Sequence, residues 1–115
     1  MEEAVLFIKN VNQIIKENLD NPNLKGAFIA KKLNISRMQL HRKLKKTVNE
    51  NAGTYILKFK IAYAKRELQH TAKYIYQISK EAGFKDYTHF SKAFKKSTGL
   101  SPLFFKKKHK MKNRE

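Results

Sequence analysis

The sequence contains an internal repeat of about 50 residues, which constrains the fold more than any other feature. Leu40, Leu44 and the run Lys45-Lys46-Thr47 align with Phe90, Phe94 and the run Lys95-Lys96-Ser97. The alignment continues through further pairs: Ala52 with Pro102 and Tyr55 with Phe105 at an offset of 50, then Ile29 with Ile78, Ala30 with Ser79 and Leu33 with Ala82 at an offset of 49. The chain must therefore build one short supersecondary unit twice.

The apolar residues recur with the period of helices, and no useful stretch alternates with the period of a strand. Turn and capping signals such as Asn21-Pro22-Asn23, Gly83 and Ser101-Pro102 separate the periodic segments. We predict an all-α fold of about seven helices, over residues 8–19, 24–33, 37–48, 54–69, 75–82, 87–97 and 102–109.

Each copy of the repeat reads as a short helix, a tight turn and a second helix with a basic face. This is the arrangement of a helix-turn-helix, in which the second helix enters the major groove of DNA. We predict a first helix-turn-helix subdomain over residues 1–52, a linker helix over 53–70, a second subdomain over 71–110 and a basic tail over 111–115.

The charge of the chain favours a polyanionic partner. The 115 residues have a formal net charge of +17. The first 24 residues carry two basic and four acidic side chains, whereas the remainder carries 24 basic and five acidic ones. Such a field attracts phosphate backbones and also anionic membranes, so charge alone does not choose the partner.

Composition argues against several other classes of protein. The absence of cysteine excludes thiol nucleophiles, disulfides and cysteine-ligated metals, and the four histidines contain no i, i+4 pair, so we expect no metal site and no cofactor. No paired carboxylates or Gly-rich phosphate loop stands out, and we expect no enzyme. The longest apolar run, Ala4 to Ile8, is too short to span a membrane. An acidic start rules out a secretory signal, and we expect a cytoplasmic protein.

In each second helix we expect two apolar residues one turn apart to face the core, Leu40 and Leu44 in the first copy and Phe90 and Phe94 in the second. The helical period then identifies the opposite, exposed face. In the first copy this face carries Arg37, Met38, His41, Arg42 and Lys45, and in the second copy it carries Tyr87, Thr88, Ser91, Lys92 and Lys95. Candidates for contacts with phosphate are Ser36, Lys46, His89 and Lys96. The alternative for each residue is a solvated charge or a packed side chain.

Individual roles follow from donor and acceptor chemistry. Arg42 can donate to guanine O6 and N7 in a bidentate pair, and Lys92 can contact guanine or a phosphate. His41 can donate or accept, whereas Met38 and Tyr87 offer apolar contact to a thymine methyl group. The lysines near the helix ends are better placed for phosphates than for bases.

Residues 8–107 resemble the AraC-type DNA-binding domain. The second copy carries the resemblance through Ile78-Ser79-Lys80-Glu81-Ala82-Gly83-Phe84, His89-Phe90-Ser91-Lys92-Ala93-Phe94-Lys95-Lys96, Gly99-Leu100-Ser101-Pro102 and Phe105. The linker helix fits with Tyr55-Ile56, Lys60-Ile61, Ala64 and Leu68. The segment Gln39-Leu40-His41-Arg42-Lys43-Leu44 is similar to the output modules of hybrid two-component regulators in that family.

Several positions depart from the family pattern. The first copy has Val48-Asn49-Glu50-Asn51-Ala52 in place of Thr-Gly-x-Ser-Pro, so Asn49 should adopt the left-handed conformation and the linker helix should start weakly. Gly26 should cost about 1 kcal/mol relative to alanine. Tyr74 stands where a capping residue is expected, and Glu67 occupies a position that is usually apolar.

The resemblance implies sequence-specific binding of double-stranded DNA by two recognition helices in successive major grooves, about 34 Å apart, and regulation of transcription. It also implies RNA polymerase as a partner and an upstream sensory or receiver domain, which we expect to be absent from this chain. The main alternative is a sequence-indifferent, nucleoid-type basic protein. Others are a membrane-surface or partner-binding helical bundle and an enzyme; the DNA-repair methyltransferase that accompanies relatives of this domain needs a cysteine.

Overall fold

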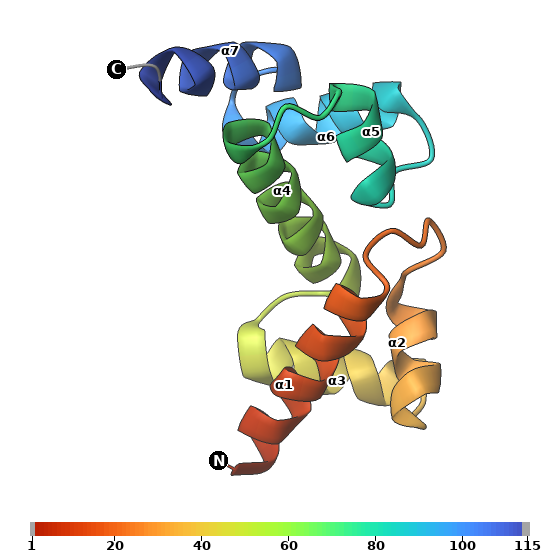
Figure 1. Cartoon of the computed structure of the whole chain (residues 1–115). Coiled ribbons are helices and arrows are strands. Elements are labelled where there is room, and N and C mark those ends of the chain that lie inside the picture. Colours follow the sequence, from red (N-terminus) through yellow and green to blue (C-terminus); the bar gives the residue numbers. More distant parts are fainter. Residues whose placement is uncertain (1, 114–115) are drawn as a thin grey trace. The chain divides into compact units, whose positions relative to one another are not determined.

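The computed structural model describes residues 2–113, and their side chains as far as His109. Over this range the chain forms seven α-helices and no strand, which confirms the predicted all-α class (Figure 1). They are α1 (Glu2–Glu17), α2 (Gly26–Leu33), α3 (Arg37–Val48), α4 (Ala52–His70), α5 (Ile75–Glu81), α6 (Tyr87–Thr98) and α7 (Pro102–Asn113). Side chains of the predicted tail, residues 111–115, lie outside the described residues.

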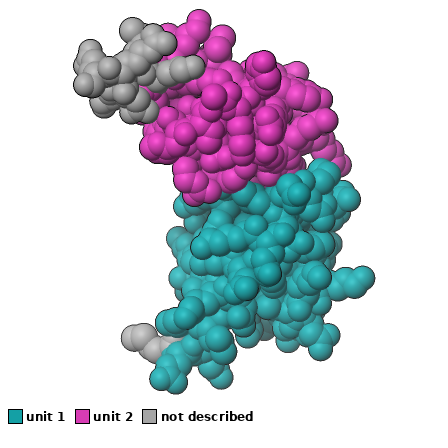
Figure 2. Space-filling view, viewed as in Figure 1, with its two compact units in different colours: residues 1–59 teal, residues 60–115 magenta. Residues whose placement is uncertain are grey.

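The chain divides into two compact units, residues 1–59 and residues 60–115, which Figure 2 colours separately. The division passes through α4, so one helix contributes to both units. Each unit contains one short helix followed by one basic second helix: α2 and α3 in the first, α5 and α6 in the second.

Aliphatic side chains fill the first core. Val11 and Ile15 of α1 are fully buried, and they belong to one cluster with Leu40 and Leu44 of α3. The buried cluster also contains Leu24, which precedes α2, Ile29 and Ala30 of α2, and Ile56 of α4. Because Leu40 and Leu44 lie one turn apart on the buried side of α3, the other side of this helix faces solvent.

Aromatic side chains pack together in the second core. The rings of Phe84, Phe90, Phe94 and Phe105 follow one another at centroid distances of 5.1, 5.7 and 5.2 Å. Phe90 and Phe94 are fully buried and correspond to Leu40 and Leu44 of the first copy. Edge-on and tilted contacts of this kind add to the burial energy of the rings.

Helix α4 corrects one sequence prediction. In the sequence Leu57 lies four residues before Ile61, and this helical spacing predicts Leu57 as the inward residue at the start of α4. In the structure Ile56 is buried and Leu57 is only half-buried. Ile56 belongs to the first core, whereas Ile61, Ala64 and Leu68 lie in the second unit and are buried. A helix that supplies two cores does not keep a single apolar stripe along its length.

Left-handed residues end helices at equivalent places in the two copies. After α2 and α3 these residues are Asn34 and Asn49, with φ of 58° and 57°, so the prediction for Asn49 is confirmed. Behind α5 and α6 they are Gly83 and Gly99, with φ of 82° and 85°. Asparagine tolerates this conformation better than other side chains, and glycine adopts it without strain.

Among the described residues, side chains cap the starts of four helices, and at α7 Ser101 Oγ accepts the N–H of Phe104 at 3.2 Å. Ser36 and Gln39 form a reciprocal capping box at α3, and the Asp86 carboxylate accepts the backbone N–H of His89 at α6. The expectation of a weak start for the linker helix, α4, was wrong, because Asn51 Oδ1 accepts the N–H of Thr54 at 2.8 Å and caps the helix. The side chain of Tyr74 makes no such bond at α5, as expected.

The glycine in α2 also has a reason that the sequence did not reveal. A Cβ atom at Gly26 would lie 3.1 Å from the Cβ of Ala52, at the start of α4. The missing side chain therefore permits close approach of α2 and α4, and this gain opposes the cost of about 1 kcal/mol expected from helix propensity.

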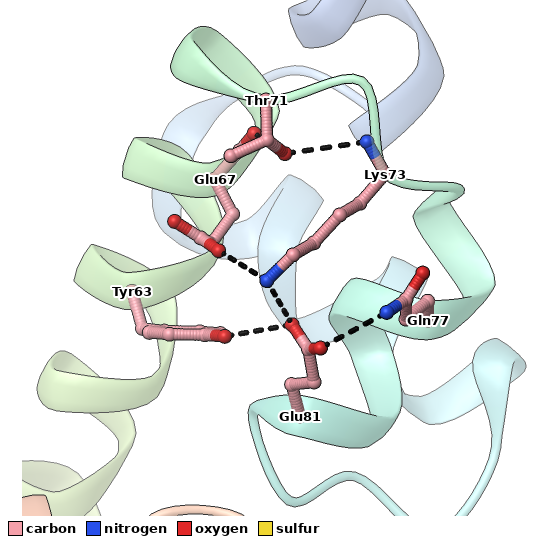
Figure 3. Close-up of polar contacts among 6 residues, drawn as sticks. All are labelled: Tyr63, Glu67, Thr71, Lys73, Gln77 and Glu81. Atoms are coloured by element: carbon pink, nitrogen blue, oxygen red, sulfur yellow. Dashed lines mark hydrogen bonds and ion pairs between the residues drawn. The ribbon is translucent and has the colours of Figure 1, made fainter.

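A polar cluster in the second unit joins α4 to α5 (Figure 3). The Lys73 ammonium lies 2.8 Å from Glu67 Oε1 and 3.0 Å from Glu81 Oε1, and the Tyr63 hydroxyl donates to Glu81 Oε1 at 2.7 Å. Glu67 is thus paired, which explains a carboxylate at a position where the family has an apolar residue. The bridge ties the loop between α4 and α5 to both helices.

The cluster shifts the ionisation of its members. Burial, the bond to Glu81 and the nearby carboxylates raise the pKa of Tyr63 to about 12. The hydrogen bonds to Glu67 and Glu81 raise the pKa of Lys73. The pKa of Glu81 is lowered, and the hydrogen bond from Tyr63 is the largest cause. Tyr63 and Lys73 therefore contribute to the free energy of unfolding at neutral pH, and this contribution is lost as pH rises through their raised pKa values. The contribution of Glu81 is lost as pH falls through its lowered pKa.

We predict opposite effects for two glycine-to-alanine substitutions. Gly99→Ala should lower the free energy of unfolding by about 1–2 kcal/mol, because its φ of 85° is strained for alanine although a Cβ would meet no atom within 4 Å. Gly53→Ala should raise it by about 0.4–1 kcal/mol, since this helical site accepts a Cβ at ordinary contact distance. Urea unfolding followed by circular dichroism measures both; equal effects would contradict the assignment of strain to Gly99.

We predict that the Tyr63 hydroxyl ionises at a higher pH than a free tyrosine side chain does. The difference between the ultraviolet pH titrations of the wild type and Tyr63→Phe should show one tyrosinate with a midpoint near 12. A midpoint near 10, the value of a free side chain, would mean that the hydroxyl does not stay on Glu81. Circular dichroism over the same pH range verifies that the chain is still folded where the signal is read.

Candidate nucleic-acid interface

The predicted recognition face of α3 is open to solvent. Arg37, Met38, His41, Arg42 and Lys45 are all exposed, and the apolar side chain of Met38 is 72% exposed. The buried pair Leu40 and Leu44 turns Met38, Arg42 and Lys45 away from the core. Arg37 lies three and seven positions before that pair and is exposed at the start of the helix.

On α6 the predicted face is less uniform. Thr88, Lys92 and Lys95 are exposed, whereas Ser91 is half-buried. Tyr87 is 36% exposed, and its ring lies 6.1 Å from the ring of Phe90, so part of it packs on the second core. The five residues lie on one helix, but Ser91 and Tyr87 present less surface than the three others.

The four candidates for phosphate contacts are also exposed. The Ser36 hydroxyl oxygen accepts the Gln39 N–H at 3.0 Å, which leaves the hydroxyl hydrogen able to donate. His89 packs its ring edge-on against Phe84 at a centroid distance of 5.5 Å. Lys46 and Lys96 lie in the last turns of α3 and α6.

The cations of both recognition helices are available to a partner. Among the residues that the structure describes, the ion pairs involve Lys58 and Lys73, and none involves a cation of α3 or α6. A shallow surface hollow on α3 is lined by Gln39, Arg42, Lys43, Lys45 and Lys46. The Lys43 ammonium lies 5.5 Å from the centroid of the Phe7 ring. Clustered cations without a carboxylate partner suit a phosphate backbone better than they suit a folded core.

Two residues that matter here were missed in the sequence. Gln39 is exposed on α3 and lines the same hollow as Arg42, and Asp86 sets the start of α6. The signal was present in both cases, since a serine followed three residues later by glutamine, or an aspartate before a periodic run, marks a helix start.

The structure gives no indication of two other kinds of site. Over the described residues, no group of three or more His, Asp or Glu side chains is placed to hold a metal ion. None of the described helices is long and apolar enough to cross a membrane.

The sequence of this chain is similar to those of known proteins. A family model described as a helix-turn-helix domain matches residues 29–108, more than half of the chain. The Msm operon regulatory protein of Streptococcus mutans is 36% identical over 101 residues; the match covers 88% of this chain and 36% of that protein. The chain therefore spans little more than a third of this relative's length.

Solved structures show the same fold. The C-terminal domain of AraT, a response regulator from Geobacillus stearothermophilus, superposes with a TM-score of 0.83 at 26% identity, over 88% of this chain and 84% of that one. The DNA-binding domain of AdpA, solved with a target DNA, has a TM-score of 0.85 at 15% identity, over 94% and 96% of the two chains, a likeness of fold alone.

The repeated short helix, left-handed turn and exposed basic helix coincide with the residues that the family model matches. The resemblance found in the motifs of the second copy is thus confirmed. The chain belongs to the AraC-type family of helix-turn-helix domains.

Proposed function

We propose that this chain is the sequence-specific DNA-binding part of a transcriptional regulator. Helices α3 and α6 each enter a major groove, and the two grooves follow one another on one face of the duplex. The observation that carries the proposal is the repeat itself: two second helices of equivalent construction, each with an exposed basic face that forms no ion pair within the described part of the chain. A monomer with two such helices recognises an asymmetric site without needing dimer symmetry.

In this proposal the two helices recognise different bases. On α3, Arg42 donates to guanine O6 and N7, His41 contacts a neighbouring base edge and Met38 contacts a thymine methyl group. Lys92 is the equivalent of Arg42 on α6, with Thr88, Ser91 and Tyr87 around it. Arginine makes a planar bidentate contact and lysine a point contact, so the first helix should discriminate more strongly.

The remaining candidates bind the backbone and set the register. Arg37, Lys45, Lys46, Lys95 and Lys96 neutralise phosphates, and the Ser36 hydroxyl and His89 donate to phosphate oxygens. These contacts add affinity without sequence information, and they make binding strongly dependent on salt.

The regulatory setting follows from the length of the relatives. Because the Msm operon regulatory protein is much longer than this chain and AraT is a response regulator, we propose that a signal-receiving part acts together with this module. RNA polymerase then receives the output at a promoter. The proposed site of action is the cytoplasm, where bacterial DNA lies.

We predict that selection from a randomised duplex pool at about 150 mM salt enriches one asymmetric motif with two sub-sites about 10 base pairs apart. Arg42→Ala should relax one sub-site and Lys92→Ala the other, each at a cost of about 1–3 kcal/mol in specific binding. Lys65→Ala, on the exposed surface of α4, is the matched control for loss of a cation. Tight binding with no enriched motif would instead indicate a sequence-indifferent, nucleoid-type protein.

We predict that the logarithm of the association constant falls against the logarithm of salt concentration with a slope of about −5 to −9, which corresponds to roughly 6–10 neutralised phosphates. Fluorescence anisotropy with a labelled duplex at four or more salt concentrations measures this slope. Lys46→Ala and Lys96→Ala should each reduce the slope by about one, with equal losses on specific and unrelated sequences. A salt-independent affinity would exclude the proposed backbone contacts.

A further inference from the structure

Gln39 has a side-chain geometry that no other residue on the two recognition helices shares among the described residues. Its backbone N–H donates to Ser36 Oγ at 3.0 Å, and its side-chain Oε1 accepts the Ser36 N–H at 2.9 Å. It is nevertheless exposed. The side chain is therefore held by its bond from the Ser36 N–H, within a reciprocal pair of bonds between the two residues, although it faces solvent.

This capping box determines which end of the amide points outward. A backbone N–H bonds only to an acceptor, so the amide oxygen must face Ser36 and the amide nitrogen must face away. A free glutamine presents a donor and an acceptor together. Held in this way, Gln39 presents its two N–H groups, and its orientation costs little further side-chain entropy on binding.

The amide also lies in the right part of the helix to reach a base pair. Gln39 is the third residue of α3, and the first residues of a recognition helix are those that contact base edges. It precedes Arg42 by three positions, so the two side chains lie on one face and line the same shallow hollow.

We propose that Gln39 is a specificity-determining residue that donates to a keto oxygen, guanine O6 or thymine O4, next to the base contacted by Arg42. Glutamine usually recognises adenine by accepting from N6 and donating to N7, but the oxygen needed for that pair is turned toward Ser36. Cytosine presents a donor at this edge and is excluded. The inference deepens the proposed function and rests on it.

The second copy provides an internal comparison. His89 is the equivalent of Gln39, and its backbone N–H donates to the Asp86 carboxylate at 2.7 Å. Its ring packs against Phe84, and no side-chain bond returns to the backbone of Asp86 in the described structure. The donor-only amide is thus a property of α3, and its effect should be confined to one of the two sub-sites.

The substitution Gln39→Glu separates the cap from the contact with DNA. Glutamate still accepts the Ser36 N–H, which preserves the capping box, but it presents an acceptor in place of two donors. In the duplex selection, preference at one base pair of one sub-site should move from guanine or thymine, which present a keto oxygen, to cytosine or adenine, which present an amino group, by roughly fivefold or more. Gln13→Glu, exposed on α1, is the control for the same change of charge.

Three measurements make the outcome decisive. Urea unfolding should give Gln39→Glu the stability of the wild type, whereas Gln39→Ala should lose stability together with the base preference. An unchanged motif for Gln39→Glu, with affinity lowered evenly on all duplexes, would overturn the inference and leave Gln39 as a cap near a phosphate. If the wild type enriches no motif at all, the proposed function fails, and this inference fails with it.

Discussion

The burial of two residues one turn apart on each second helix decides what the rest of the surface can do. Leu40 and Leu44 in one unit, and Phe90 and Phe94 in the other, have almost no exposed area. Each pair fixes the rotation of its helix about its own axis, so the polar residues between and around it must face water. The exposure of the basic faces is a consequence of this burial. Their cations form no ion pair among the residues that the structure describes, which makes them suited to a polyanion.

Much of this arrangement could be predicted from the sequence, because the repeat supplies the same pattern twice. The seven helices, the left-handed Asn49 and the exposed face of α3 follow from period and turn chemistry. The predictions were wrong or incomplete where the environment of a residue is set by a distant part of the chain. Ile56 replaces Leu57 in the core because α4 serves two cores, and Gly26 is needed because Ala52 lies beside it. No local period contains that information.

The candidate site shows the same division. Exposure of most predicted residues followed from the helical period, but the partial burial of Ser91 and the packing of Tyr87 on Phe90 depend on tertiary contacts. The cap formed by Asn51 and the pairing of Glu67 with Lys73 were invisible for a related reason, since both residues replace what the family pattern expects. At these two positions the departure from the family pattern marks a different solution, whereas Tyr74 leaves the start of α5 without a side-chain cap.

The helix shared by the two units has a thermodynamic consequence. Because α4 gives Ile56 to the first core and Ile61, Ala64 and Leu68 to the second, melting of this helix exposes apolar surface of both. Unfolding of α4 should therefore destabilise both units, and we expect a heat-capacity scan to contain one cooperative transition in place of two. A ligand that binds only the first unit would also protect the amides of the second from hydrogen exchange.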